Sequence, residues 1–395
     1  MKKLTLLICL MLIAAPGFAQ WQQTSLNNIA YSVEAIAAKV DTIYVWSSSY
    51  NMYLSTDDGI TWITVNNGLP TSYNIQALVY SGSNIFAGSY IGMFLSTNNG
   101  GNWTSVNTGL TNTNILSIAA RGDTVFAGTD GGGVFITTNN GISWQPVNTG
   151  LTNTIITALA IKDSNIFAGT GGGGIFLSTN NGQAWTAVNN GLPINSNISS
   201  LAIKDSNIFA GYFAGVYMSS NNGGLWTTTN NGLPNTAICA IAIRDSNIFA
   251  GSCSSDGVYI SSNNGNSWAI SGLGSFNIWS LAASDSTLFA GTEPGELYKI
   301  SLSGNLVGTQ EVSNNGCYIN LYPNPFITSA TLQLSKPLQY ATLIFYDILG
   351  KEIKRMQNLS GKEITLQRDG MKSGMYFYSL TDRAGVIGQG KMVVE

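Results

Sequence analysis

Tryptophan recurs at a nearly constant interval along most of this 395-residue chain. Seven of the nine tryptophans stand at positions 21, 62, 103, 144, 185, 226 and 268, so five steps are 41 residues long and the last is 42. A period of about 40–45 residues with several short strands per unit is typical of a β-propeller. The period therefore predicts an all-β ring of similar sheets.

Each repeat contains four apolar runs separated by turn residues. In one repeat they are residues 198–206, 207–211, 215–223 and 225–233. Runs that are apolar on both faces suit strands packed between two neighbouring sheets. With 44% hydrophobic residues, 9% charged residues and 45 glycines, the composition fits short strands joined by Gly/Asn turns rather than a disordered chain.

The two ends of the repeat region complement each other. Residues 21–28 read as a fourth strand with no unit before it, and residues 278–301 form a last unit that lacks a fourth strand. Pairing the two closes the ring and leaves no free sheet edge. We therefore predict a seven-bladed β-propeller over residues 20–301, closed by its N-terminal strand.

Each repeated tryptophan after the first ends an octet. Residues 55–62 read STDDGITW, and the other five octets carry Asn at the third position. The octet resembles the Asp-box of bacterial neuraminidase-type (BNR) repeats, Ser-x-Asp-x-Gly-x-Thr-Trp. An Asp or Asn oxygen can accept N–H bonds inside the turn, the glycine can take a positive φ, and the tryptophan ring can pack against the hairpin.

A catalytic or metal-binding carboxylate would not tolerate asparagine in five of six copies. The octets are therefore predicted to be structural, and their defining residues are Ser55, Asp57, Gly59, Trp62, Trp103, Trp144, Trp185, Trp226 and Trp268.

The composition changes after a polar linker at residues 302–316. Residues 317–395 carry Tyr-Pro-Asn-Pro at 322–325, DILGKE at 347–352, Gly374-x-Tyr376 and Lys-Met-Val-Val at 391–394. These motifs resemble the C-terminal sorting domain of the type IX secretion system of Bacteroidetes-type bacteria. The resemblance implies an Ig-like β-sandwich that is recognised by the secretion machinery and removed on export. The alternative is an ordinary accessory sandwich.

Residues 1–19 have the features of a Sec signal peptide. Lys2 and Lys3 precede an apolar core, and small residues precede Gln20. No other segment of the sequence is long and apolar enough to be a transmembrane helix. We therefore expect a protein that is secreted or displayed at the outer cell surface.

The residue inventory excludes several kinds of function. Histidine is absent, which removes histidine bases, catalytic triads and the commonest metal ligand. A net charge of −3 provides no excess of positive charge for binding the phosphates of a nucleic acid. No metal-binding loop or Cys/His cluster is present, so neither a metal nor a cofactor is expected. Sialidase activity is disfavoured because the family's site needs three convergent arginines, whereas residues 21–305 contain Arg121 and Arg244 alone.

In Asp-box propellers, which the octets resemble, the usual ligand face lies at the end of the ring opposite the octets, and the copies disagree at the positions expected there. The loop residue after the second strand and the second residue of the first strand vary while the framework repeats, as on a binding surface carried by a rigid scaffold. The alternative is that the loop sequences vary because no function constrains them. The ligand-binding candidates chosen from this end are Tyr90, Asp130, Phe213, Asp256, Trp279 and Glu293.

Carboxylates on this face could also serve glycoside hydrolysis. The catalytic candidates are Glu34, Glu293 and Asp130, and Glu34 is expected near Glu293 because the first and last units are neighbours. We favour a non-catalytic module that binds an extracellular glycan or protein. A carboxylate-dependent glycoside hydrolase acting on extracellular polysaccharide, and a structural surface-layer component, remain alternatives.

Cys239 and Cys253 flank one turn almost symmetrically. In a hairpin of that register they would lie opposite one another, so a cross-strand disulfide is predicted for an exported protein. Two buried small residues are the alternative. Cys317 would then be unpaired in the linker.

Overall fold

A computed structural model describes residues 21–26, 32–72, 74–302, 311–312, 318–322, 328–347, 350–383 and 385–394. The chain divides into two compact units, one of residues Trp21–Ser303 and one that contains Gly304–Glu395. The predicted signal peptide, most of the predicted linker, Cys317 and the prolines at 323 and 325 lie outside the described residues. In the described parts no helix is long and apolar enough to cross a membrane.

In the first unit the described residues form seven four-stranded sheets, all antiparallel and numbered here in chain order. Sheet 1 contains β2 (Val33–Lys39), β3 (Thr42–Ser47), β4 (Asn51–Ser55) and β5 (Ile63–Thr64). Sheet 2 contains β6 (Ile75–Ser81), β7 (Asn84–Ser89), β8 (Gly92–Ser96) and β9 (Thr104–Ser105). Sheet 3 contains β10 (Ile115–Arg121), β11 (Thr124–Thr129), β12 (Gly133–Thr137) and β13 (Gln145–Pro146). Sheet 4 contains β14 (Ile156–Lys162), β15 (Asn165–Thr170), β16 (Ile175–Ser178) and β17 (Thr186–Ala187).

The remaining three sheets continue the pattern. Sheet 5 contains β18 (Ser200–Lys204), β19 (Asn207–Tyr212), β20 (Gly215–Ser219) and β21 (Thr227–Thr228). Sheet 6 contains β22 (Ile238–Arg244), β23 (Asn247–Ser252), β24 (Val258–Ser261) and β25 (Ala269–Gly272). Sheet 7 contains β26 (Asn277–Ala283), β27 (Thr287–Glu293), β28 (Leu297–Ser301) and the N-terminal β1 (Gln22–Gln23).

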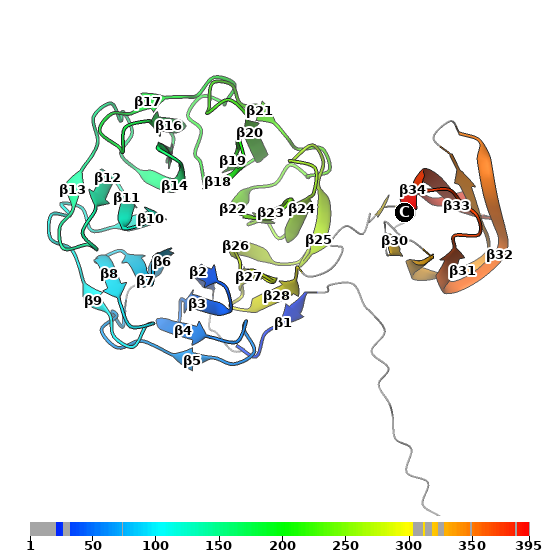
Figure 1. Cartoon of the computed structure of the whole chain (residues 1–395), viewed down its shortest axis with the longest axis horizontal. Coiled ribbons are helices and arrows are strands. Elements are labelled where there is room, and N and C mark those ends of the chain that lie inside the picture. Colours follow the sequence, from blue (N-terminus) through cyan, green and yellow to red (C-terminus); the bar gives the residue numbers. More distant parts are fainter. Residues whose placement is uncertain are drawn as a thin grey trace, which may run out of the picture. The chain divides into compact units, whose positions relative to one another are not determined.

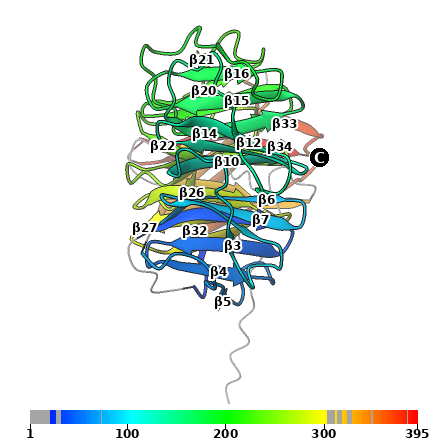
Figure 2. The same ribbon diagram turned by 90° about the vertical axis from the view of Figure 1, so that its left-hand side faces the viewer.

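The seven sheets form a closed ring with their first strands innermost (Figure 1). Each first strand contacts the first strand of the next sheet, and β26 contacts β2. β1 pairs with β28, with Gln22 opposite Lys299, which is the pairing that the incomplete first and last repeats predict. The strands run across the thickness of the ring (Figure 2).

The second strand of each sheet is almost completely buried, and a glycine in it sets how closely the next sheet approaches. A Cβ placed on Gly251 would lie 2.6 Å from Cγ2 of Ile278 in the next sheet. Real Cβ atoms do not tolerate such a contact, so a glycine is needed wherever the neighbouring backbone approaches this closely. Sheet 1 departs from the pattern because its equivalent residue is the fully buried Trp46.

Replacement of Gly251 by alanine is therefore expected to lower the free energy of unfolding by about 1–3 kcal/mol, as overpacking does in other cores. Gly274→Ala is the matched control, because its added Cβ meets only Cδ1 of Ile270 at 3.4 Å. Urea titration of both variants measures the difference. Equal stability of the two variants would contradict the close approach of sheets 6 and 7.

The octet lies between the third and fourth strands and holds a tight turn. The Ser55 hydroxyl donates to Asp57 Oδ1 (2.7 Å) and accepts from the Gly59 N–H (2.8 Å), while the Thr61 N–H donates to Asp57 Oδ1 (2.8 Å). Asparagine does the same in the next copy, where Asn98 Oδ1 accepts from the Asn102 N–H at 2.9 Å. The shared acceptor explains why asparagine and aspartate are interchangeable at this position.

The tryptophan of the octet does more than pack against its own hairpin, which is where the sequence analysis places it. The Trp103 indole Nε1 donates to the carbonyl of Val65 in the preceding sheet (2.9 Å). The same bond to the preceding sheet is made by Trp144, Trp185, Trp226 and Trp268. The fourth strand lies at the outer edge of its sheet, so the residue before it can reach the neighbour. The octets therefore tie consecutive sheets together.

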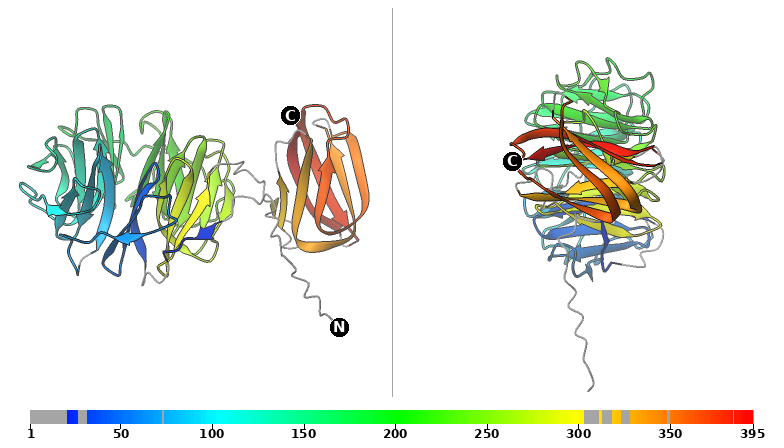
Figure 3. Two further views of the ribbon diagram at one scale, coloured as in Figure 1. Left: turned by 60° about the horizontal axis from the view of Figure 1, so that its bottom comes forward. Right: turned by 90° about the vertical axis from the view of Figure 1, so that its right-hand side faces the viewer.

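In the second unit the described residues form one six-stranded antiparallel sheet. Its strands are β29 (Glu311–Val312), β30 (Tyr318–Tyr322), β31 (Ser329–Tyr346), β32 (Glu352–Gln367), β33 (Gly374–Asp382) and β34 (Gly385–Val394). β31 pairs with β30 in its first half and with β33 in its second, and β32 follows it throughout with register shifts. The long β31–β32 pair is visible in Figure 3. The core of the second unit is apolar and includes Leu332, Leu343 and Tyr378.

Candidate functional site

Antiparallel pairing separates two ends of the ring. In every sheet the turn between strands one and two lies at one end, and in sheets 1 to 6 the octet between strands three and four lies at the same end. The connections between strands two and three, and those between sheets, lie at the other, which we call the loop end. Tyr90 follows β7, Glu293 ends β27, and Glu34 and Trp279 stand near the starts of β2 and β26. All four are therefore at the loop end.

Six residues of sheets 7, 1 and 2 line a cavity of about 320 Å³ at this end, which we call the rim cavity. They are Ser32, Glu34, Gln76, Tyr90, Trp279 and Glu293. Trp279 is 44% exposed and Tyr90 is 46% exposed. Most large aromatic side chains of a folded domain are covered, so two exposed rings on one cavity point to a binding surface.

Glu293 accepts a hydrogen bond from the exposed indole of Trp279. The Trp279 Nε1 donates to Glu293 Oε2 at 3.1 Å, and the Asn277 Nδ2 donates to the same oxygen at 3.2 Å. Asn277 stands opposite Glu293 in the β26–β27 ladder. The carboxylate thus fixes the orientation of the indole while nearly half of the Trp279 surface stays accessible to a ligand.

Glu34 is the more buried of the two carboxyl groups. Its Oε1 accepts from the Ser32 hydroxyl (3.1 Å) and from the Asn74 amide (2.9 Å). Burial raises the pKa of the Glu34 carboxyl above its usual range, and the Ser32 hydrogen bond opposes this only in part.

This raised pKa predicts a pH-dependent stability effect of Glu34→Gln. An acid whose pKa is raised in the folded state destabilises the fold above its unfolded pKa of about 4.3, and has no effect below it, where both states are protonated. The variant is therefore expected to melt at a higher temperature than the parent at pH 7, with the difference disappearing as the pH falls below about 4. Melting curves between pH 3 and pH 8 test this, and a difference that does not change with pH would contradict it.

Gln76 is oriented through a chain of amide contacts. The Gln76 Nε2 donates to Asn114 Oδ1 (3.3 Å), and the Asn114 Nδ2 donates to Asp130 Oδ2 (3.0 Å). Because the Asp130 carboxylate can only accept, this chain fixes both amides and leaves the Gln76 carbonyl oxygen available as an acceptor. Asp130 therefore influences the rim cavity without lining it.

Two other ligand candidates lie elsewhere at the loop end and do not line the rim cavity. Phe213 is 65% exposed and packs on the Tyr212 ring, with centroids 4.2 Å apart. Asp256 accepts from the Thr236 hydroxyl at 2.5 Å.

Of the predicted ligand and catalytic residues, the structure brings together Glu34, Tyr90, Trp279 and Glu293. It adds Ser32 and Gln76 as lining residues and Asn74 and Asn277 as positioning residues, none of which is among the predicted site residues.

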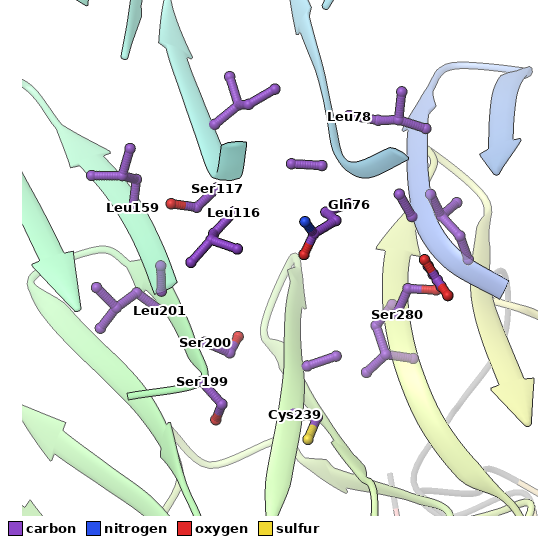
Figure 4. A pocket seen from close by; sticks show the side chains of 18 of the residues that line it. Gln76, Leu78, Leu116, Ser117, Leu159, Ser199, Ser200, Leu201, Cys239 and Ser280 are labelled. Atoms are coloured by element: carbon purple, nitrogen blue, oxygen red, sulfur yellow. The ribbon is translucent and has the colours of Figure 1, made fainter. Parts of the chain in front are cut away.

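A second cavity of about 270 Å³ occupies the centre of the ring and is lined by the first strands of all seven sheets. Figure 4 shows Gln76, Leu116, Ser199 and Cys239 around it. Its hydroxyl groups are engaged between sheets, since Ser117 donates to the Ile156 carbonyl and Ser280 to the Val33 carbonyl. Glu34 and Gln76 line both cavities.

Cys239 and Cys253 form a disulfide, with Cα atoms 5.8 Å apart. No group of three metal-ligating side chains occurs within the described ranges. Arg121 donates to Asn181 Oδ1, and Arg244 pairs with Asp285 at 3.0 Å. Both arginines end first strands, at the end opposite the rim cavity.

The closed ring of repeated four-stranded sheets defines the first unit as a β-propeller. Residues 76–212 match the model of the DUF6242 beta propeller domain, and residues 320–395 match that of the secretion system C-terminal sorting domain. The chain thus combines a β-propeller, part of which is similar to the DUF6242 propeller domain, with a type IX sorting domain, which indicates export to the outer surface or the medium. No curated protein matches the chain.

Several solved structures share this fold. YCF48 from Cyanidioschyzon merolae is 16% identical over 71% of this chain and 98% of its own, with a TM-score of 0.56. The extracellular domain of BT4673 from B. thetaiotaomicron is 15% identical over 93% of this chain and 53% of its own, with a TM-score of 0.60. The WD40 propeller of Doa1 is 14% identical over 73% and 99%, with a TM-score of 0.59. At these identities the likeness concerns the fold alone.

Proposed function

We propose that this protein is an exported seven-bladed propeller of the Asp-box type that binds an extracellular glycan or protein at its rim cavity without transforming it. A Sec signal peptide at residues 1–19 and an Ig-like sorting sandwich at its C-terminus complete the proposal. The observation that carries it is the cavity itself, which joins two exposed aromatic rings, two carboxylates and an amide.

The geometry of the cavity supports recognition of a ligand. One carboxylate oxygen of Glu293 accepts a hydrogen bond from the Trp279 indole and fixes its orientation. The indole is therefore preorganised to stack on a ligand. Preorganised aromatic platforms with a few fixed polar groups are the usual composition of ligand sites. A structure of YCF48 bound to D1 peptide provides one propeller of this fold that binds a peptide.

Glycoside hydrolysis is the second candidate, and one observation favours it. Glu34 and Glu293 line the same cavity, and burial raises the pKa of Glu34. A pair of carboxyl groups, one of which has a raised pKa, is the arrangement that a glycosidase uses for its acid and its nucleophile or base.

Arrays of glycans and peptides, together with a hydrolysis screen on polysaccharides, separate the two functions. We expect binding that is lost in Trp279→Ala and no turnover. Hydrolysis that disappears in both Glu34→Gln and Glu293→Gln would overturn the binding proposal in favour of the enzyme. Binding that survives Trp279→Ala would show that the ligand uses another surface.

A further inference from the structure

We propose that the rim cavity recognises the ammonium group of its ligand, either a lysine side chain or an amino sugar. This inference rests on the proposed binding function and specifies the chemistry of the ligand. It follows from three features of the cavity: its charge, its hydrogen-bonding inventory and its aromatic faces.

The charge of the lining is negative and uncompensated. Glu34 and Glu293 are the charged residues among the six that line the cavity, and none of the six is Lys or Arg. Their described hydrogen-bond donors are the neutral groups of Ser32, Asn74, Asn277 and Trp279. Carboxylates near one another repel, and a cation placed between them relieves that repulsion. An anionic ligand such as a sialic acid would be repelled instead.

The cavity offers more hydrogen-bond acceptors than donors. Within the described residues, Glu34 Oε2 and Glu293 Oε1 accept no hydrogen bond, because the bonds to these side chains go to the other oxygen of each. The Gln76 carbonyl oxygen is a third acceptor, since its amide nitrogen is used by Asn114. A primary ammonium carries three N–H donors and no acceptor. Its three N–H donors can therefore be satisfied by oxygens of this lining, which also include the Tyr90 hydroxyl.

The aromatic rings add a second attraction for the same ligand. Trp279 and Tyr90 are 44% and 46% exposed and line the cavity beside the carboxylates. A ring face attracts an ammonium group electrostatically, tryptophan most strongly, and stacks equally well on the methylene groups or pyranose ring that carries it. A cavity of about 320 Å³ accommodates the carrier as well as the ammonium.

Isothermal titration of the full chain with matched probes tests the inference. The ammonium probes are Nα-acetyl-lysinamide and glucosamine, and their neutral counterparts are Nα,Nε-diacetyl-lysinamide and N-acetylglucosamine. We expect the tighter-binding ammonium probe to bind about tenfold or more tightly than its neutral counterpart. A tenfold difference in affinity corresponds to the free energy of one charge-assisted hydrogen bond. The tighter of the two ammonium probes distinguishes a peptide from an amino sugar as the source.

Three variants locate the effect. Glu293→Gln and Glu34→Gln should each reduce the preference for the ammonium probe about tenfold, whereas Asp256→Asn, a loop-end carboxylate outside the cavity, should leave it unchanged. Circular dichroism and melting curves establish that the variants fold. Because glutamine at 293 can still accept from the Trp279 indole, this variant removes the charge and retains the aromatic platform.

The outcomes separate this inference from the function on which it rests. Equal affinity for charged and neutral probes, with binding still lost in Trp279→Ala, would overturn ammonium recognition and leave the binding function intact. Absence of binding to all four probes, together with empty glycan and peptide arrays, would overturn both. A preference that survives both glutamate substitutions would also overturn the inference, because the charge would then come from elsewhere.

Discussion

Deletion of residues 317–395 is expected to abolish delivery to the outer surface and to leave the propeller in the periplasm. The sorting domain that matches residues 320–395 is the part recognised by the type IX machinery. All strands of the seven sheets come from residues 22–301, so the ring is complete without this domain. Fractionation of a type IX-competent bacterium, followed by immunoblotting for the propeller, measures the distribution.

Two controls make this deletion informative. Trp279→Ala in the full chain changes the rim cavity and keeps the sorting domain, so it should reach the surface normally. A carrier protein fused to a signal peptide at its N-terminus and to residues 302–395 at its C-terminus should be exported. Truncated propeller found at the surface, with an unchanged melting transition, would show that a second export signal lies within residues 20–301.

The architecture of the propeller is largely predictable because its determinants are local and repeated. A tryptophan at the end of each octet, a glycine where sheets approach and alternating turns are each visible within one repeat. The pairing of β1 with β28 is non-local, but the two incomplete repeats specify it. The partner of each indole is less predictable, because Trp103 bonds a residue 38 positions away in another sheet.

The rim cavity could be predicted only in part. Its lining comes from both sides of the ring closure, so Ser32 and Gln76 meet Trp279 and Glu293 only after the first and last sheets become neighbours. Variation among the copies pointed to the end of the ring at which the rim cavity lies. It could not identify the sector of that end, because Phe213 occupies the same variable loop position as Tyr90 and Asp256 belongs to a loop of the same end, yet both lie outside the cavity. The hydrogen-bond chain that runs from Asp130 through Asn114 to Gln76 depends on side-chain orientation, which the sequence pattern does not specify.

Replacement of Trp144 by alanine is expected to lower the free energy of unfolding by about 3–5 kcal/mol, the usual cost of truncating a buried large aromatic residue. Trp144 is 3% exposed, donates to the Val106 carbonyl at 2.8 Å, and meets the Phe86 ring edge-on with centroids 6.5 Å apart. Both partners belong to the preceding sheet, so the substitution removes contacts between sheets. Chemical denaturation monitored by circular dichroism measures the loss.

Phenylalanine at the same position separates the hydrogen bond from the packing, and Trp62 provides a matched control. Trp144→Phe keeps an aromatic ring but leaves the Val106 carbonyl without its indole donor, which should cost about 1 kcal/mol beyond the loss of packing. In the first octet the Trp62 Nε1 is buried without a hydrogen-bond partner among the described residues. Trp62→Phe removes this unsatisfied donor, so it should be less destabilising than Trp144→Phe or even stabilising. Equal losses at both positions would show that the octet tryptophans act through packing alone, and that the indole bond to the preceding sheet contributes nothing measurable.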